Sequence, residues 1–314
     1  MSTLKASRIA VLVPCYNEEK TIAGVVRDFR NALPDATVYV YDNNSKDGTR
    51  REAAAAGAEV REEPMQGKGW VVRRMFADID ADSYVLVDGD GTYDASVAGQ
   101  MVEMLQNQKL AMVVGSRVHE AAEAYRPGHV LGNKLFTTAV ASLFGKSFTD
   151  ILSGYRVFSR PFVKSFPVFA GGFEIETELT VHALTMGLPV AELTTAYKER
   201  PIGSVSKLST YRDGFRILGT ILTLFKNERP FLFFSLVAFL FMLAALALAY
   251  PVVATFLETG LVPRLPTAIL ATGMALYALI MFACGLILDT VSKGRLETKL
   301  LAYLNASKEN ITSR

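Results

Sequence analysis

Two long runs without a charged residue lie in the last third of the sequence, and they constrain the fold most strongly. They cover Phe231–Leu257 and Leu265–Leu288. A helix that crosses a bilayer needs about 20 apolar residues, and uncharged helices of this length are rare in soluble cores. Only the segment Glu258–Arg264 separates the two runs. The sequence therefore predicts a hairpin of two membrane-spanning helices.

Basic residues gather at the outer ends of this hairpin. The turn contains only Arg264, whereas many lysines and arginines lie just outside the runs: Arg212, Arg216, Lys226, Arg229, Lys293, Arg295, Lys299 and Lys308. Positive residues mark the cytoplasmic side of a membrane protein. We expect a multi-pass protein of the cytoplasmic (inner) membrane, with the N-terminal region and both termini in the cytoplasm. No signal peptide is expected, because the first apolar run, Ile9–Pro14, is too short.

The segment Leu208–Glu228, just before the first run, has the spacing of an amphipathic helix. Its apolar residues recur at helical intervals with basic residues between them. Such a helix can lie in the headgroup region or pack on a soluble domain, and the sequence leaves both open. The expected parts are a cytoplasmic domain (1–207), an interfacial helix (208–230), transmembrane helices (231–257 and 265–288) and a cytoplasmic tail (289–314).

The N-terminal region alternates short apolar runs with helical patterns. The runs rich in valine, isoleucine, leucine and tyrosine predict strands at Ile9–Pro14, Thr37–Tyr41, Tyr84–Val87 and Ala111–Val114. Helical patterns lie between them at Thr21–Ala32, Thr49–Ala56 and Gly69–Ile79. This alternation predicts an α/β fold with a mostly parallel sheet covered by helices. Ligands of such sheets bind beyond the carboxyl ends of the strands.

Composition and motifs exclude several classes of function. The 33 basic and 31 acidic residues give a net charge of +2, too balanced for a dedicated nucleic-acid binder. The glycine-rich motifs of dinucleotide-binding and phosphate-binding loops are absent. Cys15, Cys284 and the three histidines have no metal-ligand spacing, so neither a zinc site nor a disulfide framework is expected.

The sharpest chemical signal is Asp88-Gly89-Asp90, which follows an apolar strand. Two aspartates at a strand end offer the hard oxygen ligands that Mg²⁺ or Mn²⁺ prefers, and these ions neutralise diphosphate oxygens. The glycine between them removes side-chain bulk where a phosphate must approach. Asp-x-Asp alone is also a common turn former, but its place in a series of polar strand ends favours a ligand site.

Several segments together resemble family 2 glycosyltransferases of the GT-A (Rossmann-like) fold. They are residues 14–19 (PCYNEE), 42–49 (DNNSKDGT), 67–69 (GKG), 88–94 (DGDGTYD), 115–117 (GSR), 153–156 (SGYR), 173–178 (FEIETE), Arg200 and 206–208 (SKL). Within that family the chain resembles the polyprenyl-phosphate sugar transferases, the group of the dolichyl-phosphate mannose and glucose synthases. The resemblance covers about residues 8–210, and the two-span tail resembles that of bacterial members.

The resemblance implies an inverting, metal-dependent enzyme that transfers one sugar from a nucleotide-sugar to a polyprenyl (undecaprenyl) phosphate. It implies Mg²⁺ or Mn²⁺ as cofactor, held by Asp88, Asp90 and Thr92. The residues implied for nucleotide-sugar binding are Pro14, Tyr16, Asn17, Glu18, Asp42, Asn44, Lys68, Asp88, Gly89, Asp90, Glu176, Arg200 and Lys207. Among these, Lys68 is expected at the diphosphate, Glu176 near the donor sugar, and Arg200 and Lys207 on a loop that closes over the phosphates.

For the lipid acceptor the resemblance implies Arg117 as the phosphate ligand and, with Asp88 and Asp90, as part of the catalytic set. The weaker candidates in the same region are Arg126, His129, Asn133 and Lys134. The alternative to a role in phosphate binding is that each lone basic residue is a solvated charge on the protein surface. For Glu176, pairing with Arg156 or capping of a helix is the alternative. Trp70 and Tyr155 are expected to pack rather than to catalyse.

The donor stays open at this stage. The segments Asp-Asn-Asn-Ser and Asp-Gly-Asp-Gly-Thr favour a UDP-hexose, with UDP-glucose first. Mannose-specific members often carry glutamine at the position that Thr92 occupies, which counts against GDP-mannose. GDP-mannose, UDP-N-acetylglucosamine and a UDP-uronic acid remain alternatives. A processive polysaccharide synthase is disfavoured, since the Gln-x-x-Arg-Trp motif is missing. An inactive nucleotide-sugar-binding membrane scaffold is a further alternative. The expected partners are the nucleotide-sugar, the polyprenyl phosphate, the membrane and copies of the same chain, as a homo-oligomer such as a tetramer.

Overall fold

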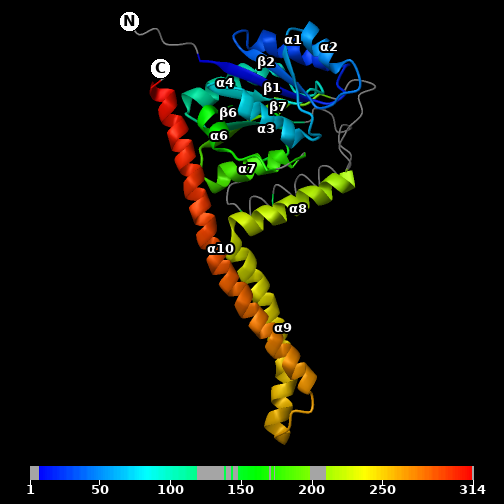
Figure 1. Cartoon of the computed structure of the whole chain (residues 1–314), viewed down its shortest axis with the longest axis vertical. Helices are drawn as coiled ribbons and strands as arrows, with labels where there is room; N and C mark the ends of the chain where they lie inside the picture. The colour runs from blue at the N-terminus through cyan, green and yellow to red at the C-terminus, as the bar shows by residue number, and fades with distance from the viewer. Residues whose placement is uncertain are drawn as a thin grey trace. The chain divides into compact units, whose positions relative to one another are not determined.

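The computed structural model describes residues 7–118, 138, 143, 148–169, 171–172, 174–198 and 210–312. These residues form two compact units. One unit combines the described residues up to 221 with those from 299 onward, and the other covers 222–298. Figure 1 shows the elements of both units in chain order.

The first unit is built on a seven-stranded sheet with the order β3-β2-β1-β4-β6-β5-β7. Strand β6 runs antiparallel to β4 and β5, and the remaining pairings are parallel. The strands are β1 (Ile9–Cys15), β2 (Thr37–Asp42), β3 (Glu59–Glu62), β4 (Ser83–Leu86), β5 (Met112–Val118), β6 (Arg156–Ser159) and β7 (Val190–Ala196). The predicted mostly parallel α/β fold is therefore confirmed, and β3, β6 and β7 add to the four strands expected from the sequence.

Helices cover both faces of this sheet (Figure 1). They are α1 (Ile22–Ala32), α2 (Thr49–Ala55), α3 (Lys68–Asp78), the short 3₁₀ helix η1 (Ala95–Val97), α4 (Ala98–Asn107), α6 (Arg160–Ser165) and α7 (Ile175–Thr185). Three of them begin and end within a residue or so of the helices that the apolar spacing predicts. Longer helices follow: α8 (Thr210–Glu228), α9 (Pro230–Thr259) and α10 (Leu265–Thr312).

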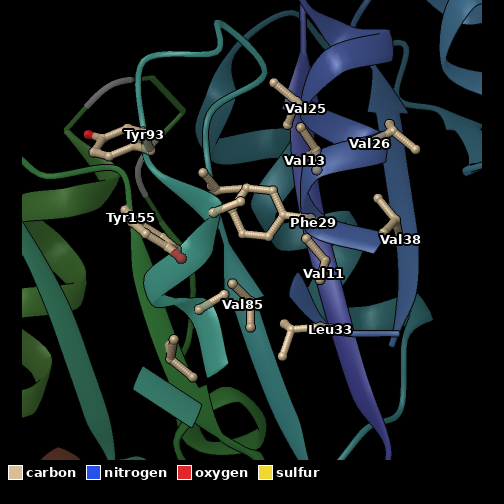
Figure 2. Close-up of a cluster of buried hydrophobic side chains, with 14 of the residues drawn as sticks. Val11, Val13, Val25, Val26, Phe29, Leu33, Val38, Val85, Tyr93 and Tyr155 are labelled. Atoms are coloured by element: carbon tan, nitrogen blue, oxygen red, sulfur yellow. The ribbon is translucent and has the colours of Figure 1, made fainter. Parts of the chain in front are cut away.

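Alternation along β1 divides the hydrophobic core between the two faces. Val11 and Val13 belong to a buried cluster that also contains apolar residues of α1 and α4, and Figure 2 shows Phe29 of α1 among them. The Phe29 ring meets Tyr155 edge to face, with ring centroids 5.8 Å apart. Fully burying side chains of this size stabilises the fold by about 1.5–3 kcal/mol each. Tyr155 is a packing residue, as predicted.

An aromatic cluster packs between the sheet and α3, α6 and α7. Phe162 stacks on Phe158 at 4.9 Å and on Phe166 at 5.9 Å between ring centroids. His182 of α7 is buried and meets the edges or faces of Phe162 and Phe166. Burial lowers the pKa of His182 to about 3, so this histidine is neutral and acts as an aromatic core residue.

The parallel register brings the ends of three strands to one edge of the sheet. Cys15 at the end of β1 lies opposite Asp42 at the end of β2, and Leu12 lies opposite Leu86 at the end of β4. The antiparallel strand β6 begins at this edge, because Arg156 pairs with Leu86. Residues that follow β1, β2 and β4, and those that precede β6, therefore surround one site.

The last part of α10 belongs to the same compact unit as the sheet. Tyr303 forms a side-chain hydrogen bond with Ser159, which also accepts a hydrogen bond from the backbone of Phe162 at the start of α6. Ala306, one turn further along α10, is buried. The sheet unit is thus made of two separate stretches of chain.

In the second unit, α9 and α10 carry small buried residues seven positions apart. They are Ala238, Ala245 and Val252 on α9, and Ala271 and Ala278 on α10. A seven-residue repeat of small residues lets two helices pack closely along a left-handed crossing. Beyond it, Ser292 and Arg295 donate hydrogen bonds to the carbonyl of Asn227 at 3.1 and 3.0 Å.

Both helices are long and apolar enough to cross a membrane, with mean hydropathies of 2.7 and 2.1 in their most apolar windows. Only 11% and 17% of those windows are buried within the protein, unlike the core helices of a soluble domain. The two expected runs are therefore helices with outward-facing apolar surface. Helix α10 continues to Thr312, well beyond the apolar run that ends at Leu288.

We predict that Arg156→Met strongly destabilises the sheet unit. The fully buried guanidinium donates to the carbonyls of Ser153 and Ile151 at 2.9 and 2.7 Å and to Thr180 Oγ1 at 2.8 Å. Its removal leaves these buried acceptors without their donor, at a cost of roughly 3 kcal/mol. The thermal midpoint of the full chain in detergent should fall by about 5–10 °C.

The matched control is Arg74→Met, which removes the same group from the exposed surface of α3. Within the described part of the chain, Arg74 pairs only with Asp78 one turn away, at 2.9 Å, and such a pair contributes about 0.5 kcal/mol. Equal shifts in the two variants would contradict a structural role for the buried guanidinium.

Candidate active site

The end of β2 presents a buried acceptor. Asp42 is 1% exposed, and its Oδ2 accepts from the Ser45 backbone at 3.1 Å and pairs with Arg50 at 3.2 Å. Its Oδ1 is buried without a hydrogen-bond partner among the described residues. A buried acceptor without a donor is costly, so a ligand N–H or O–H group at this position would be bound favourably. This fits the predicted contact of Asp42 with a base or ribose.

The segment after β1 is tied to the aspartates that follow β4. The backbone of buried Glu18 donates to Thr49 Oγ1 at 2.8 Å. The Thr21 hydroxyl approaches Glu18 Oε2 at 3.3 Å and the Gly89 carbonyl at 2.8 Å. A Cβ on Gly89 would lie 2.6 Å from Cys15 Sγ. These contacts hold the 14–19 and 88–90 segments, with half-buried Pro14 and Tyr16, against each other.

Two asparagines predicted to bind the donor also connect the loops of the site by hydrogen bonds. Asn17 and Asn44 have positive φ angles of 51° and 64°, a conformation that asparagine tolerates better than most residues. The Asn17 side chain accepts from the Lys46 backbone at 2.8 Å, and the Asn44 side chain donates to the Pro64 carbonyl at 2.9 Å. Their side chains therefore orient the backbone around the ligand site, and donor contact by them stays a prediction.

Sequence reasoning missed Asn43, which organises the same loops. Its Nδ2 donates to the carbonyls of Glu63 and Met65 at 2.8 and 2.7 Å, and its Oδ1 accepts from the Gly67 backbone at 2.7 Å. Asn43 thus links the end of β2 to the residue before α3. The sequence signal for Asn43 was its position in a polar segment at the end of a strand. Such a position does not distinguish a residue that contacts a ligand from one that holds a loop in place.

The two aspartates after β4 differ in their surroundings. Asp90 is buried, and its Oδ1 accepts from both the backbone and the hydroxyl of Thr92 at 3.2 and 2.7 Å. Thr92 is fully buried and therefore orients the Asp90 carboxylate. The Asp88 side chain is 30% exposed, so it can reach a ligand directly.

The Asp88–Asp90 pair suits a hard divalent cation in the chemistry of its donor atoms. Among the described residues no group of three or more histidines, cysteines, aspartates or glutamates could hold a metal. Mg²⁺ is usually bound by one or two carboxylates together with substrate phosphates and water. A cation at this pair would accordingly depend on oxygens of the donor diphosphate.

Lys68 lies between two carboxylates that come from different elements. Its ammonium pairs with Asp88 Oδ1 at 2.5 Å and also with Glu176 Oε1. Burial lowers the pKa of Lys68, but the two carboxylates outweigh it and raise the pKa overall. Burial likewise raises the pKa of Glu176, against the opposing effect of Lys68. The partner of Glu176 is thus Lys68, whereas Arg156 binds backbone carbonyls and Thr180.

Arg117 at the end of β5 is held by an aspartate that the sequence did not single out. Its Nε and Nη2 donate to the two oxygens of Asp150 at 2.6 and 2.9 Å, a bidentate pair. The guanidinium also lies over the Tyr197 ring, 5.4 Å from its centroid. A fork of this kind fixes both the position and the plane of the guanidinium. Long-range pairs of this sort leave no spacing in the sequence.

The segment before β6 completes the site edge. Ser153 donates to the Gly115 carbonyl at 2.6 Å, and the Gly154 backbone donates to the Tyr93 hydroxyl at 2.8 Å. A Cβ on Gly154 would lie 2.4 Å from Asp88 Oδ2. The backbone of this segment therefore sits directly on the Asp88 carboxylate.

The structure brings together predicted site residues from the ends of β1, β2, β4 and β5 and from the first turns of α3 and α7. These are Pro14, Tyr16, Glu18, Asp42, Lys68, Asp88, Gly89, Asp90, Thr92, Arg117 and Glu176. Six candidates lie outside the described residues, namely Arg126, His129, Asn133, Lys134, Arg200 and Lys207. Their expected roles at the acceptor and donor phosphates stay predictions.

The fold and the carboxylates at the strand ends are those of a glycosyltransferase of the GT-A type. Comparison with known proteins agrees with this class. Residues 10–166 match the family described as glycosyl transferase family 2. The chain is 37% identical to the glycosyltransferase AglJ of Haloferax volcanii, over 77% of this chain and 80% of that protein. The protein belongs to glycosyltransferase family 2.

Two further similarities refine the comparison. A dolichyl-phosphate hexose transferase of Haloferax volcanii is 26% identical over 70% of this chain and 95% of that protein. This similarity confirms the predicted resemblance to polyprenyl-phosphate sugar transferases. A crystal structure of Mycobacterium tuberculosis glucosyl-3-phosphoglycerate synthase, in complex with Mn²⁺, UDP-glucose and phosphoglyceric acid, has the same fold. It has a TM-score of 0.56 and 24% identity, over 70% of this chain and 80% of that one.

We predict that Asp150→Asn lowers sugar transfer by about 10- to 100-fold. The substitution removes the charge that holds Arg117, and misplacement of a charged ligand-binding group by about 1 Å costs up to 100-fold. Nucleotide binding measured by calorimetry should change little, because Asp150 lies at the β5 side of the site. Asp35→Asn, on an exposed turn before β2, is the control. A loss confined to nucleotide affinity would contradict this role.

We also predict that Gly154→Ala weakens Mn²⁺ binding without unfolding the protein. The added methyl would meet the Asp88 carboxylate and turn it away from a shared cation. The measurement is Mn²⁺ titration followed by electron paramagnetic resonance. Gly99→Ala is the control, because its Cβ would meet nothing within 4 Å. Unchanged Mn²⁺ affinity in Gly154→Ala would show that Asp88 does not contact the metal.

Proposed function

We propose that this enzyme transfers one sugar from a nucleotide-sugar to a polyprenyl phosphate at the cytoplasmic face of the membrane. The observation that carries the proposal is the Asp88–Asp90 pair, which lies at the polar edge of a GT-A sheet. The same chain contains two helices apolar enough to cross a bilayer. An acceptor with a phosphate head and a polyprenyl tail would suit both features.

The similarity to a dolichyl-phosphate hexose transferase supports a polyprenyl phosphate as the acceptor. The Mn²⁺ and UDP-glucose in the structure of similar fold support a divalent cation and a UDP-hexose, with UDP-glucose first. GDP-mannose is the alternative donor. The basic residues outside the hairpin support placement of the sheet unit in the cytoplasm.

The chemistry asks for little acid–base catalysis. A phosphate monoester has a second pKa of about 6 and is a nucleophile at neutral pH. Its oxygen attacks the anomeric carbon from the side opposite the nucleoside diphosphate, which leaves with the electron pair of the bond that breaks. The configuration of that carbon is inverted, and no proton has to be removed from the acceptor.

Charge stabilisation is therefore the main contribution of the protein. Two anionic groups, the acceptor phosphate and the donor diphosphate, must come close together. Arg117, fixed by Asp150, supplies a cation on the β5 side, and Lys68 supplies one beside Asp88. A divalent cation held by Asp88 and Asp90 would stabilise the charge of the departing diphosphate. Asp42 would accept a hydrogen bond from the nucleoside and so fix the position of the nucleoside in the site.

The test is a donor panel with the full chain in detergent. The protein is incubated with undecaprenyl phosphate, Mn²⁺ or Mg²⁺, and UDP-glucose, UDP-N-acetylglucosamine, a UDP-uronic acid or GDP-mannose. Release of UDP or GDP and formation of glycolipid are measured. We expect acceptor-dependent release from one donor, with UDP-glucose the fastest.

The matched pair of variants is Asp90→Asn and Asp94→Asn, which change the same group four residues apart. Asp90→Asn should lower release by at least 100-fold, a size typical for loss of one electrostatic group. Asp94 accepts a hydrogen bond from the Ser96 backbone at 3.0 Å, an interaction that asparagine retains, so Asp94→Asn should stay near wild type. If no donor released UDP or GDP, the proposal would be contradicted and a scaffold role would be favoured.

A further inference from the structure

The ammonium of Lys68 is a cation shared by two carboxylates. It pairs with Asp88 Oδ1 and Glu176 Oε1, and the Lys68 and Glu176 side chains are only 8% and 5% exposed. Asp88 is the more exposed partner, at 30%. A buried carboxylate needs a counter-charge, and in the described part of the chain Glu176 finds it in Lys68.

The backbone around Lys68 leaves it little freedom to move away. Lys68 is the first residue of α3, and Gly67 before it has φ of +136°. The Gly67 backbone donates to Asn43 Oδ1 at 2.7 Å. A Cβ on Gly67 would lie 2.0 Å from the Gly171 carbonyl oxygen, so the start of α3 is pressed against the segment that leads into α7. Lys68 and Glu176 are thus held together by their own backbones.

The other buried cation nearby is already committed. Arg156 donates hydrogen bonds to Ser153, Ile151, Thr180 and the sulfur of Met112. Glu176 Oε2 is buried with no hydrogen-bond partner among the described residues. Arg156 acts on Glu176 electrostatically but donates no hydrogen bond to it among the described residues. The direct pair of Glu176 is Lys68, and because Asp88 is the more exposed partner, the contact of Lys68 with Asp88 is the one that a ligand can exchange.

We propose that Lys68 is a positioning residue that acts as an internal counter-ion for Asp88 and makes metal binding depend on the nucleotide. Without ligand, the ammonium holds Asp88. A divalent cation at Asp88 must displace the ammonium from that oxygen. When the donor diphosphate arrives, its negative charge accommodates the displaced ammonium, and Lys68 remains with Glu176. This inference rests on the proposed function for the site of the diphosphate.

The consequence is positive coupling between Mn²⁺ and nucleotide. Lys68 opposes the metal alone, because two cations compete for one carboxylate. It favours the metal and diphosphate together. By thermodynamic linkage, each ligand then raises the affinity for the other by the same factor. If Lys68 served only as a diphosphate contact, its removal would weaken nucleotide binding. The affinity for Mn²⁺ in the absence of nucleotide would then stay unchanged.

The experiment measures Mn²⁺ affinity of the full chain in detergent by electron paramagnetic resonance, with and without UDP or GDP. In Lys68→Met, Mn²⁺ alone should bind at least about fivefold more tightly than in wild type, and the increase caused by nucleotide should shrink by a similar factor. Arg74→Met, which removes one exposed positive charge from the same helix, should stay within about twofold of wild type.

Two more variants keep the inference testable if Lys68→Met fails to fold. Glu176→Gln leaves the ammonium to Asp88 alone and should weaken the binding of Mn²⁺ alone. Lys68→Arg keeps the charge and should retain most of the coupling. Unchanged or weaker Mn²⁺ binding in Lys68→Met, or tighter binding in Glu176→Gln, would overturn the inference.

The two proposals fail in different ways. If wild type binds Mn²⁺ with a nucleotide but Lys68→Met behaves the same, the counter-ion role is wrong and the proposed transfer reaction stands. If wild type binds no Mn²⁺ with either nucleotide, both the counter-ion role and the metal-dependent reaction are overturned.

Discussion

Parallel pairing of β1 with β2 and β4 is the constraint on which the rest of the sheet unit depends. It sets Cys15 beside Asp42 and carries Leu86, and with it the aspartates that follow β4, to the same edge. Helices on both faces bury the strands so fully that polar side chains gather where the strands end. The antiparallel strand β6 then starts at that edge and lays the Gly154 backbone against Asp88. The same strand register thus determines both the position of the site residues and the packing that stabilises the fold.

The sequence revealed most of this arrangement wherever the pattern was strong. Four apolar strands and three helices were predictable because one residue type repeats with a clear period. Strand β3 was missed because Glu59–Glu62 is mostly charged and lies at the edge of the sheet. The helical course of α10 beyond Leu288 was not foreseen either, since no apolar run continues there.

The site was predictable as a set of residues, but less so as a set of contacts. Asp88 and Asp90 stand where the strand pattern puts them. The tie between Arg117 and Asp150, and the place of Lys68 between two carboxylates, join residues far apart in the chain. Only the folded backbone reveals such pairs. Asn17 and Asn44 show the reverse case, because residue types that suit ligand binding also suit positive φ angles and loop fastening.

The packing of the end of α10 with the sheet unit has a consequence for biosynthesis. Residues 299–312 belong to the same compact unit as the N-terminal residues, and Tyr303 bonds to Ser159 at the start of α6. The ribosome makes residues 299–312 only after both apolar runs, Phe231–Leu257 and Leu265–Leu288. The nascent N-terminal unit therefore stays incomplete until the hairpin has been synthesised. Completion of the sheet unit is in this way tied in time to synthesis of the two apolar helices, which are long and apolar enough to cross a membrane.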